Sequence, residues 1–144
     1  GPLAWVGRVA PEKGLDVQGS FRAVLAADLN MDGVEDLLVT QVADRTLVFM
    51  SEGCTEANWI RVDAPIGAVV QIVAGDVRQT NWVRVGRGYQ STARIPLHFG
   101  LGDSESVAEI RVSYGGDEYV IDGPIAPRQT VTVRGPAPLV SGKE

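Results

Sequence analysis

Short runs of β-branched and aliphatic residues, separated by turn residues, recur along almost the whole chain. Runs such as Leu37–Thr40 and Val69–Val73 are followed by Gly, Pro, Asn or Asp, and turn signals return every ~8–12 positions. Within Trp82–Val85 and Val131–Val133 the apolar residues alternate with period two, which puts one face of a strand on a core and the other in water. No stretch keeps the apolar stripe of a helix. These features predict an all-β fold, a sandwich or a barrel.

Length and composition place the chain among globular proteins of about one domain. It has 144 residues, of which 44% are hydrophobic and 22% are charged, and these values exclude disorder and collagen. A chain of this size buries roughly two thirds of its unfolded surface, so it needs no disulfide. Cys54 is the single cysteine, and no internal disulfide is therefore expected.

Charge and hydropathy exclude two classes of partner. No window approaches the roughly 18 apolar residues of a membrane span, and residues 1–20 show no apolar segment behind a basic start. We therefore expect neither a span nor a signal peptide within this chain. The arginines are scattered singly, which is unlike a nucleic-acid binder. Residues 1–64 carry ten acids against five bases, while residues 65–144 carry eight of each.

The sharpest motif is an acidic loop at residues 28–36, which reads Asp-Leu-Asn-Met-Asp-Gly-Val-Glu-Asp. Oxygen-bearing side chains stand at positions 1, 3, 5 and 9 around a glycine at position 6, and this is the spacing of a calcium loop. So many carboxylates would repel one another unless a cation neutralised them. The alternative is a polar turn without metal. The expected Ca²⁺ ligands are the side chains of Asp28, Asn30, Asp32 and Asp36 and the carbonyl of Val34.

The flanks of the acidic loop read as strands, and Val39 stands where an EF-hand would place Glu. A strand–loop–strand unit of this kind resembles the FG-GAP or VCBS-type repeat, which forms part of a propeller blade in integrin-like proteins. A single copy cannot bury its own faces. Residues 1–57 are therefore expected to be a partial propeller blade or a docked hairpin. Two arrangements stay open: the chain belongs to a larger propeller-containing protein, or the hairpin packs on the second domain.

Residues 58–134 carry a second set of motifs, and residues 135–144 read as a flexible tail. The segment opens with Asn-Trp-Ile-Arg-Val at 58–62, continues with Ile-Gly-Ala-Val-Val at 66–70 and Gly-Tyr-Gln-Ser at 88–91, and reaches His-Phe-Gly-Leu-Gly at 98–102. These strings resemble the ASPIC and UnbV domain, although Val69 stands where the family usually has Arg, and Val112–Gly116 replaces the family's strand end, which carries Trp and Pro. The resemblance implies a β-sandwich. Members such as cartilage acidic protein are secreted or matrix-associated, others are exported by bacteria, and no general enzymatic activity accompanies the domain.

The sequence offers no convincing catalytic group. His98 is the single histidine, and no nucleophile-elbow sequence surrounds any serine. If Leu97 and Phe99 face the core, His98 faces outward. Gly100 and Gly102 are expected to take positive φ in a tight turn, with Leu101 plugging the core between them. We therefore expect no enzyme.

The remaining candidates are ligand contacts, and each also has a structural interpretation. A ring such as Tyr89 suits a core, Trp59 and Trp82 alternate with aliphatic residues as core rings do, and arginines on strands are usually solvated. The candidate ligand-contact residues are Tyr89, His98, Trp82 and Arg87. Arg84, Arg87 and Arg94 could form a stripe toward an acidic partner.

Taken together, the sequence predicts a β-sandwich preceded by an FG-GAP-like calcium-loop hairpin. The expected function is a calcium-stabilised, secreted or exported module for protein–protein or matrix interaction, as in cell adhesion, with a protein or glycan ligand at the cell surface. The alternative is a calcium-dependent carbohydrate-binding β-sandwich, in which exposed aromatic rings stack on sugars. The rings available for stacking are Trp5, Trp59, Trp82 and Tyr89.

Overall fold

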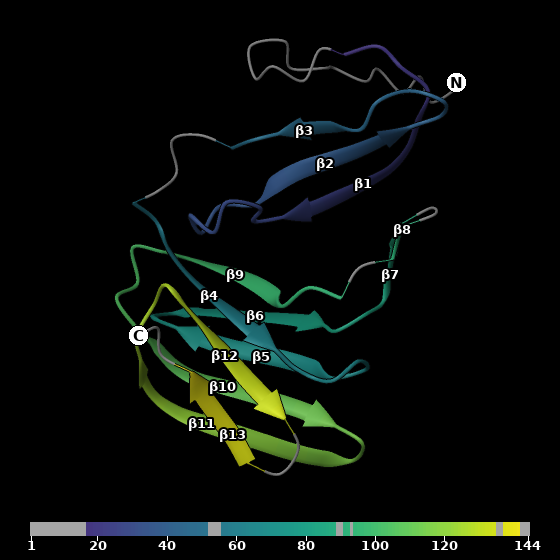
Figure 1. Ribbon diagram of the computed structural model, residues 1–144. Helices are drawn as coiled ribbons and strands as arrows, with labels where there is room; N and C mark the ends of the chain where they lie inside the picture. Colours follow the sequence, from purple (N-terminus) through teal and green to yellow (C-terminus); the bar gives the residue numbers. More distant parts are fainter. Residues whose placement is uncertain (1–16, 52–55, 89–90, 93, 135–136, 142–144) are drawn as a thin grey trace, which may run out of the picture.

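The computed structural model describes residues 17–51, 56–88, 91–92, 94–134 and 137–141, and its regular structure within these ranges is entirely β (Figure 1). The strands form two four-stranded sheets, one three-stranded sheet and one two-stranded ribbon. The expected all-β class is confirmed. The strands are β1 (Phe21–Ala27), β2 (Asp36–Gln41), β3 (Leu47–Phe49), β4 (Asn58–Asp63), β5 (Val69–Ala74), β6 (Val77–Trp82), β7 (Gly86–Gly88), β8 (Ser91–Thr92), β9 (Leu97–Gly102), β10 (Val107–Tyr114), β11 (Asp117–Ile125), β12 (Gln129–Arg134) and β13 (Ala137–Ser141).

The two four-stranded sheets form a β-sandwich, with strand orders β11-β10-β5-β6 and β13-β12-β4-β9. β12 and β4 pair in parallel, and the other described pairings in the sandwich are antiparallel. Alternate side chains point inward, so β4 buries Ile60 and Val62 while β5 buries Val70 and Ile72. Phe99 is the aromatic ring among these otherwise aliphatic core residues. The period-two pattern of the sequence therefore reflects one face of each strand on this core.

The N-terminal sheet, formed by β1, β2 and β3, lies above the β9 side of the sandwich (Figure 1). Its antiparallel register pairs Leu25 with Leu38 and Leu38 with Val48. Apolar side chains stand on both of its faces, and Val24 and Val48 remain 55% and 50% exposed. Three short strands cannot bury two apolar faces by themselves. The sheet therefore depends on what it docks against.

The ribbon of β7 and β8 rises from the sandwich and reaches the N-terminal sheet (Figure 1). Both of its strands contact β1. Gly86 pairs with Thr92 across the ribbon. The sequence does not reveal this ribbon, because Gly-rich segments are read as turns.

The strand predicted at Trp82–Val85 is displaced in the structure. β6 ends at Trp82, and Val83 to Val85 follow it outside the strand. The turn that begins β6 contains Gly75, whose φ is +55°. Because β6 is an edge strand, most of its residues are polar, and a search for apolar runs misses it.

Two details near β9 also differ from expectation. The apolar run Ile95–Phe99 predicts a strand from Ile95, but β9 begins at Leu97, because Pro96 has no N–H to donate to a ladder. Gly102 has a φ of +56°, but Gly100 lies within the strand without a positive φ. Leu101 does plug the core and is 7% exposed.

Part of the segment expected to be a flexible tail forms an edge strand. β13 pairs antiparallel with β12, with Val140 opposite Val131. The sequence did not predict this strand because of the prolines at 136 and 138, although an edge strand tolerates proline. Within the described residues, no helix is long and apolar enough to span a membrane.

Candidate functional site between the N-terminal sheet and the sandwich

The acidic loop closes on itself through hydrogen bonds from its own backbone. The backbone N–H of Asp32 donates to Oδ1 of Asp28 and to Oδ1 of Asn30, each at 3.1 Å. The N–H of Gly33 donates to Oδ2 of Asp28 at 2.7 Å, and the N–H of Val34 donates to Oδ1 of Asp32 at 2.8 Å. These contacts gather the side-chain oxygens of the first three expected ligands on the inside of one turn.

Asp36 ties the end of the loop to the rest of the N-terminal sheet. Its side chain is fully buried. Oδ2 accepts the backbone N–H of Leu29 at 2.9 Å, and Oδ1 accepts that of Ser51 at 2.8 Å. The hydroxyl of Ser51 in turn donates to the carbonyl of Glu35 at 2.6 Å. A buried carboxylate that accepts a backbone N–H on each oxygen holds the two backbone segments together.

Arg61 of β4 connects the sandwich to the acidic loop. Its guanidinium donates to Oδ2 of Asp28 and forms an ion pair in which the two side chains are 16% and 2% exposed. The same guanidinium lies over the Trp59 ring, 4.5 Å from the ring centroid. The cation is therefore held between an aromatic face and a buried carboxylate, which is a strong geometry for arginine.

Gly33 provides the closest approach between the loop and the sandwich. It is buried, and its φ is +97°. A Cβ at this position would lie 1.8 Å from Nε1 of Trp59. Glycine is therefore required here both by backbone conformation and by space.

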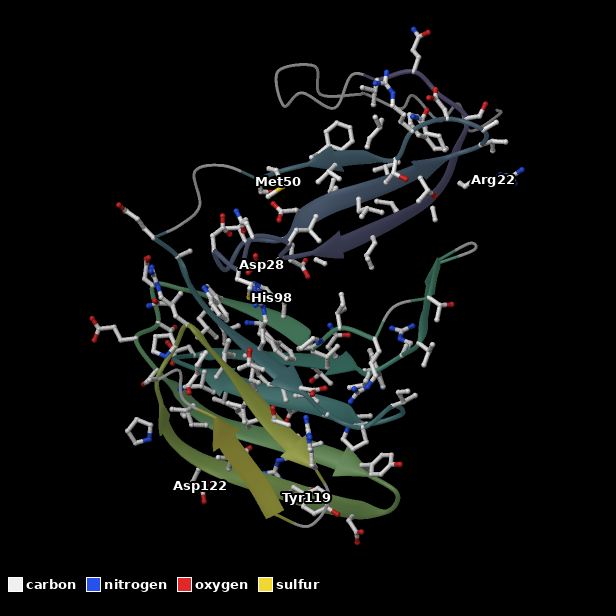
Figure 2. The ribbon with its side chains drawn as sticks, in the orientation of Figure 1. Arg22, Asp28, Met50, His98, Tyr119 and Asp122 are labelled. Atoms are coloured by element: carbon white, nitrogen blue, oxygen red, sulfur yellow. The ribbon has the colours of Figure 1, made fainter. Side chains whose placement is uncertain are left out.

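His98 lies on the same outer face of the sandwich. Leu97 and Phe99 are 0% and 2% exposed, so His98 points away from the core, as the alternation predicted. His98 therefore faces the N-terminal sheet. Figure 2 shows Asp28 and His98 close to each other between the sheet and the sandwich. The imidazole stacks on Trp59 with the ring centroids 5.9 Å apart. Its Nδ1 is buried and has no hydrogen-bond partner within the described part of the chain.

Two hollows open between the N-terminal sheet and the sandwich, and Glu35 and His98 line both of them. Their volumes are about 120 Å³ and 300 Å³. The smaller hollow also contacts Asp28, Arg61 and Thr130. Acidic groups from the sheet therefore face basic and aromatic groups from the sandwich across one interface.

Burial lowers the pKa of His98 below its ordinary value of 6.5. Glu35 raises this pKa and Arg61 lowers it, but burial is the largest cause. The unfolded chain therefore binds the proton more tightly than the folded chain. Stability from this residue is complete above the ordinary pKa and declines as the pH falls below it.

We expect the wild-type protein to lose more unfolding free energy than a His98→Gln variant between about pH 7.5 and pH 5.5, the range in which histidine titrates. Chemical denaturation at both pH values measures this difference. The carboxylates are common to both proteins, so their titration cancels in the comparison. Equal losses in the two proteins would contradict this assignment.

The acidic loop offers oxygens of the kind that a hard cation binds, but these oxygens already accept hydrogen bonds within the structure. Oδ2 of Asp28 accepts both the N–H of Gly33 and the guanidinium of Arg61, and Oδ2 of Asp32 accepts the side-chain amide of Asn30 at 2.8 Å. Oδ1 of Asp28 and Oδ1 of Asp32 each accept one N–H and keep a lone pair. Asp36 is committed to backbone donors. Among the described residues, no three His, Cys, Asp or Glu side chains cluster at metal-binding distances, so a cation would rely on the Asn30 amide and backbone oxygens as well. Arg61 already places one positive charge on Asp28.

Among the other sequence-predicted contact residues, the side chain of Trp82 is described and lies away from this site. Trp82 lies on β6 and is 48% exposed, rather than in the core as its alternation suggested. Tyr89 and Cys54 lie outside the described residues, and only the backbone of Arg87 is described. Of the predicted ligand contacts whose side chains are described, His98 is part of the interface and Trp82 is not.

Sequence reasoning did not identify Arg61, Trp59 and Gly33 as members of the site. The Trp59–Val62 pattern alternates, with Ile60 and Val62 buried, and this alternation alone places Trp59 and Arg61 together on the opposite face. The pattern does not indicate which residues Trp59 and Arg61 contact. Arg61 meets a carboxylate 33 residues earlier in the chain, and no local signal indicates that contact.

Comparison with known proteins identifies one family. Residues 62–138 match the family described as ASPIC and UnbV, which is more than half of the chain. No curated protein matches it.

Proposed function

Because the chain belongs to the ASPIC and UnbV family, we propose that it is a non-enzymatic, extracellular binding or scaffold module whose acidic loop holds calcium. The observation behind this proposal is that the acidic loop both contains the expected calcium ligands and contacts the sandwich. Asp28 accepts hydrogen bonds from its own loop and from Arg61 of the sandwich. A cation bound by Asp28, Asn30, Asp32 and the Val34 carbonyl would rigidify the surface through which the N-terminal sheet docks.

Conditions outside the cell suit such a loop. Calcium loops of extracellular modules bind in the range of about 10⁻⁴–10⁻³ M, close to the calcium concentration there. Because Arg61 offsets part of the charge on Asp28, we expect an affinity at the weak end of this range. The ion would supply charge neutralisation and rigidity, and no chemical step.

The surroundings of His98 support a binding role over catalysis. Its ring stacks on Trp59, and its Nδ1 makes no hydrogen bond to a described carboxylate. A catalytic imidazole needs such a partner to fix its tautomer and orientation. The positive guanidinium of Arg61 also disfavours protonation of this ring.

The N-terminal sheet is the surface that we assign to a protein or matrix partner. Phe21, Val24 and Val48 are 46%, 55% and 50% exposed. Exposed apolar residues on both faces of a small sheet favour contact with another protein surface. The rest of a larger propeller-containing chain, with this sheet as one FG-GAP-like unit, is one such surface.

Thermal unfolding in calcium, in magnesium and in excess chelator tests the proposal. With calcium at about ten times its Kd, the stabilisation RT ln(1 + c/Kd), where c is the free calcium concentration, is about 1.4 kcal/mol, and the Tm is expected to rise by about 3–8 °C. Asp32→Ala should lose the response, whereas Asp44→Ala, at an exposed aspartate outside the loop, should keep it. A Tm that chelator does not change, or an equal rise with magnesium, would contradict the proposal.

The second candidate function is carbohydrate binding, and the exposure of Trp82 favours it. Because Trp82 lies away from the acidic loop, its exposure supports sugar binding but not a dependence of that binding on calcium. An accessible indole offers a stacking face for a sugar ring. A glycan array with and without chelator separates the two candidates. Calcium-dependent glycan signals would place the ligand at the acidic loop, and silent glycans would favour the protein-binding role.

A further inference from the structure

A second surface lies at the edge of the sandwich, where β6 ends. The Trp82 platform consists of Gly67, Asn81, Trp82 and Arg84, and these residues line two adjoining hollows of about 290 Å³ and 330 Å³. Neither hollow shares a described lining residue with the hollows at the acidic loop. The platform is thus separate from the proposed calcium site.

The backbone holds the platform in place. Val83 is 5% exposed and anchors in the core, while its N–H donates to the carbonyl of Ala68 at 2.9 Å and its carbonyl accepts the N–H of Gly67 at 2.8 Å. The neighbours of a buried residue in extended chain point away from the core. Trp82 and Arg84 are accordingly both exposed.

Arg84 brings an uncommitted positive charge to the indole. Its guanidinium lies 5.5 Å from the centroid of the Trp82 ring. The described ion pairs involve Arg61, Arg94 and Arg111 but not Arg84. A guanidinium that lies against an aromatic ring and has no carboxylate partner can pair with a carboxylate of a ligand. The fork geometry of arginine favours two parallel hydrogen bonds in such a pair.

The remaining groups of the platform are polar. Oδ1 of Asn81 accepts the N–H of Trp82 at 2.9 Å, so its amide nitrogen can donate to a ligand oxygen. Gly67 adds backbone and no side chain, and the described lining holds no apolar side chain besides Trp82 and Val83. An apolar anchor of a peptide would find little to pack against. A ring with hydroxyl and carboxylate groups matches all three side chains.

We propose that the Trp82 platform is a binding site for acidic saccharides, with a uronic acid ring stacked on Trp82 and its carboxylate paired with Arg84. This inference rests on the carbohydrate alternative proposed above and names the class of sugar, but it differs in its dependence on calcium from the calcium-dependent binding expected from the sequence. Binding here requires no calcium, because the platform contains no part of the acidic loop.

Isothermal titration calorimetry with a galacturonic acid trimer, a neutral galactose trimer and a Glu-rich peptide tests the proposal. The uronate trimer should bind more tightly than the neutral trimer, and chelator should leave its Kd unchanged. Trp82→Ala and Arg84→Ala should each weaken uronate binding about tenfold or more, as loss of a stacked ring or a charged hydrogen bond does. Arg84→Ala should also remove the preference for uronate over the neutral trimer.

Arg78→Ala is the matched control, because Arg78 is an exposed arginine on β6, the strand that also carries Trp82, and it hydrogen-bonds Gln71 instead of lying over a ring. It should change the Kd less than about twofold, as expected of a solvated arginine. Absence of uronate binding, insensitivity to both platform variants, or tighter binding of the peptide would overturn the proposal. The calcium melts are unaffected by any of these results, so failure here is distinguishable from failure of the proposed calcium role.

Discussion

Replacement of Gly33 by alanine is expected to lower the free energy of unfolding by about 3 kcal/mol or more. Part of this loss, about 1–2 kcal/mol, comes from forcing an L-residue into positive φ. The rest comes from the added Cβ, which would lie 1.8 Å from Nε1 of Trp59 and must push the loop away from the sandwich. Urea unfolding followed by tryptophan fluorescence and near-ultraviolet circular dichroism measures the effect.

Gly67→Ala is the control for backbone strain. Gly67 has a φ of +92°, close to the +97° of Gly33, but nothing lies within 4 Å of its added Cβ. Gly67→Ala should lower the free energy of unfolding only by the backbone strain, about 1–2 kcal/mol. Equal losses for the two variants would mean that the contact of Gly33 with Trp59 does not hold the N-terminal sheet on the sandwich.

Arg61→Met is expected to lower the free energy of unfolding by about 2–3 kcal/mol, near the lower end for removal of one partner of a buried ion pair. The methionine retains an apolar stem over Trp59 but leaves Asp28, whose side chain is 2% exposed, without its cation. The two backbone N–H groups that remain on Asp28 limit the loss. Calcium should restore part of it, because a divalent ion on the loop supplies the missing positive charge.

Arg94→Met provides the comparison with an exposed pair. Arg94 and Asp63 are 58% and 22% exposed with their nearest atoms 3.2 Å apart, and such pairs contribute less than about 1 kcal/mol. A double-mutant cycle of Arg61→Met with Asp28→Asn isolates the buried pair. A coupling energy near zero, or a loss no larger than that of Arg94→Met, would contradict the role given to Arg61.

The strands of the sandwich core were predictable because their sequences carry the burial pattern directly. β5 buries Val70 and Ile72 and leaves Gln71 between them half-buried. β6 was not predictable in the same way, because an edge strand needs no apolar face and Val77–Trp82 is mostly polar. β13 was not predicted because Pro136 precedes it and Pro138 lies within it. β6 and β13 are both edge strands of the sandwich.

The acidic loop was identified from sequence because its residues are contiguous. Oδ1 of Asp28 and Oδ1 of Asn30 both accept the backbone N–H of Asp32, and Oδ1 of Asp32 accepts that of Val34. The interface was not identified, since it depends on Arg61 and Trp59 meeting a loop that is distant in the chain. Spacing within a motif is local information, whereas docking of one sheet on another is a property of the tertiary fold.

Hydrogen–deuterium exchange with calcium and with excess chelator tests most directly whether the loop fixes the N-terminal sheet on the sandwich. The decisive segments are 28–41, which includes the acidic loop and β2, and β4, which carries Trp59 and Arg61. Protection by a bound ion extends to the elements that it stabilises. We predict slower exchange with calcium in both segments and unchanged exchange in β10. Exchange that is the same with calcium and with chelator in both segments would contradict the account.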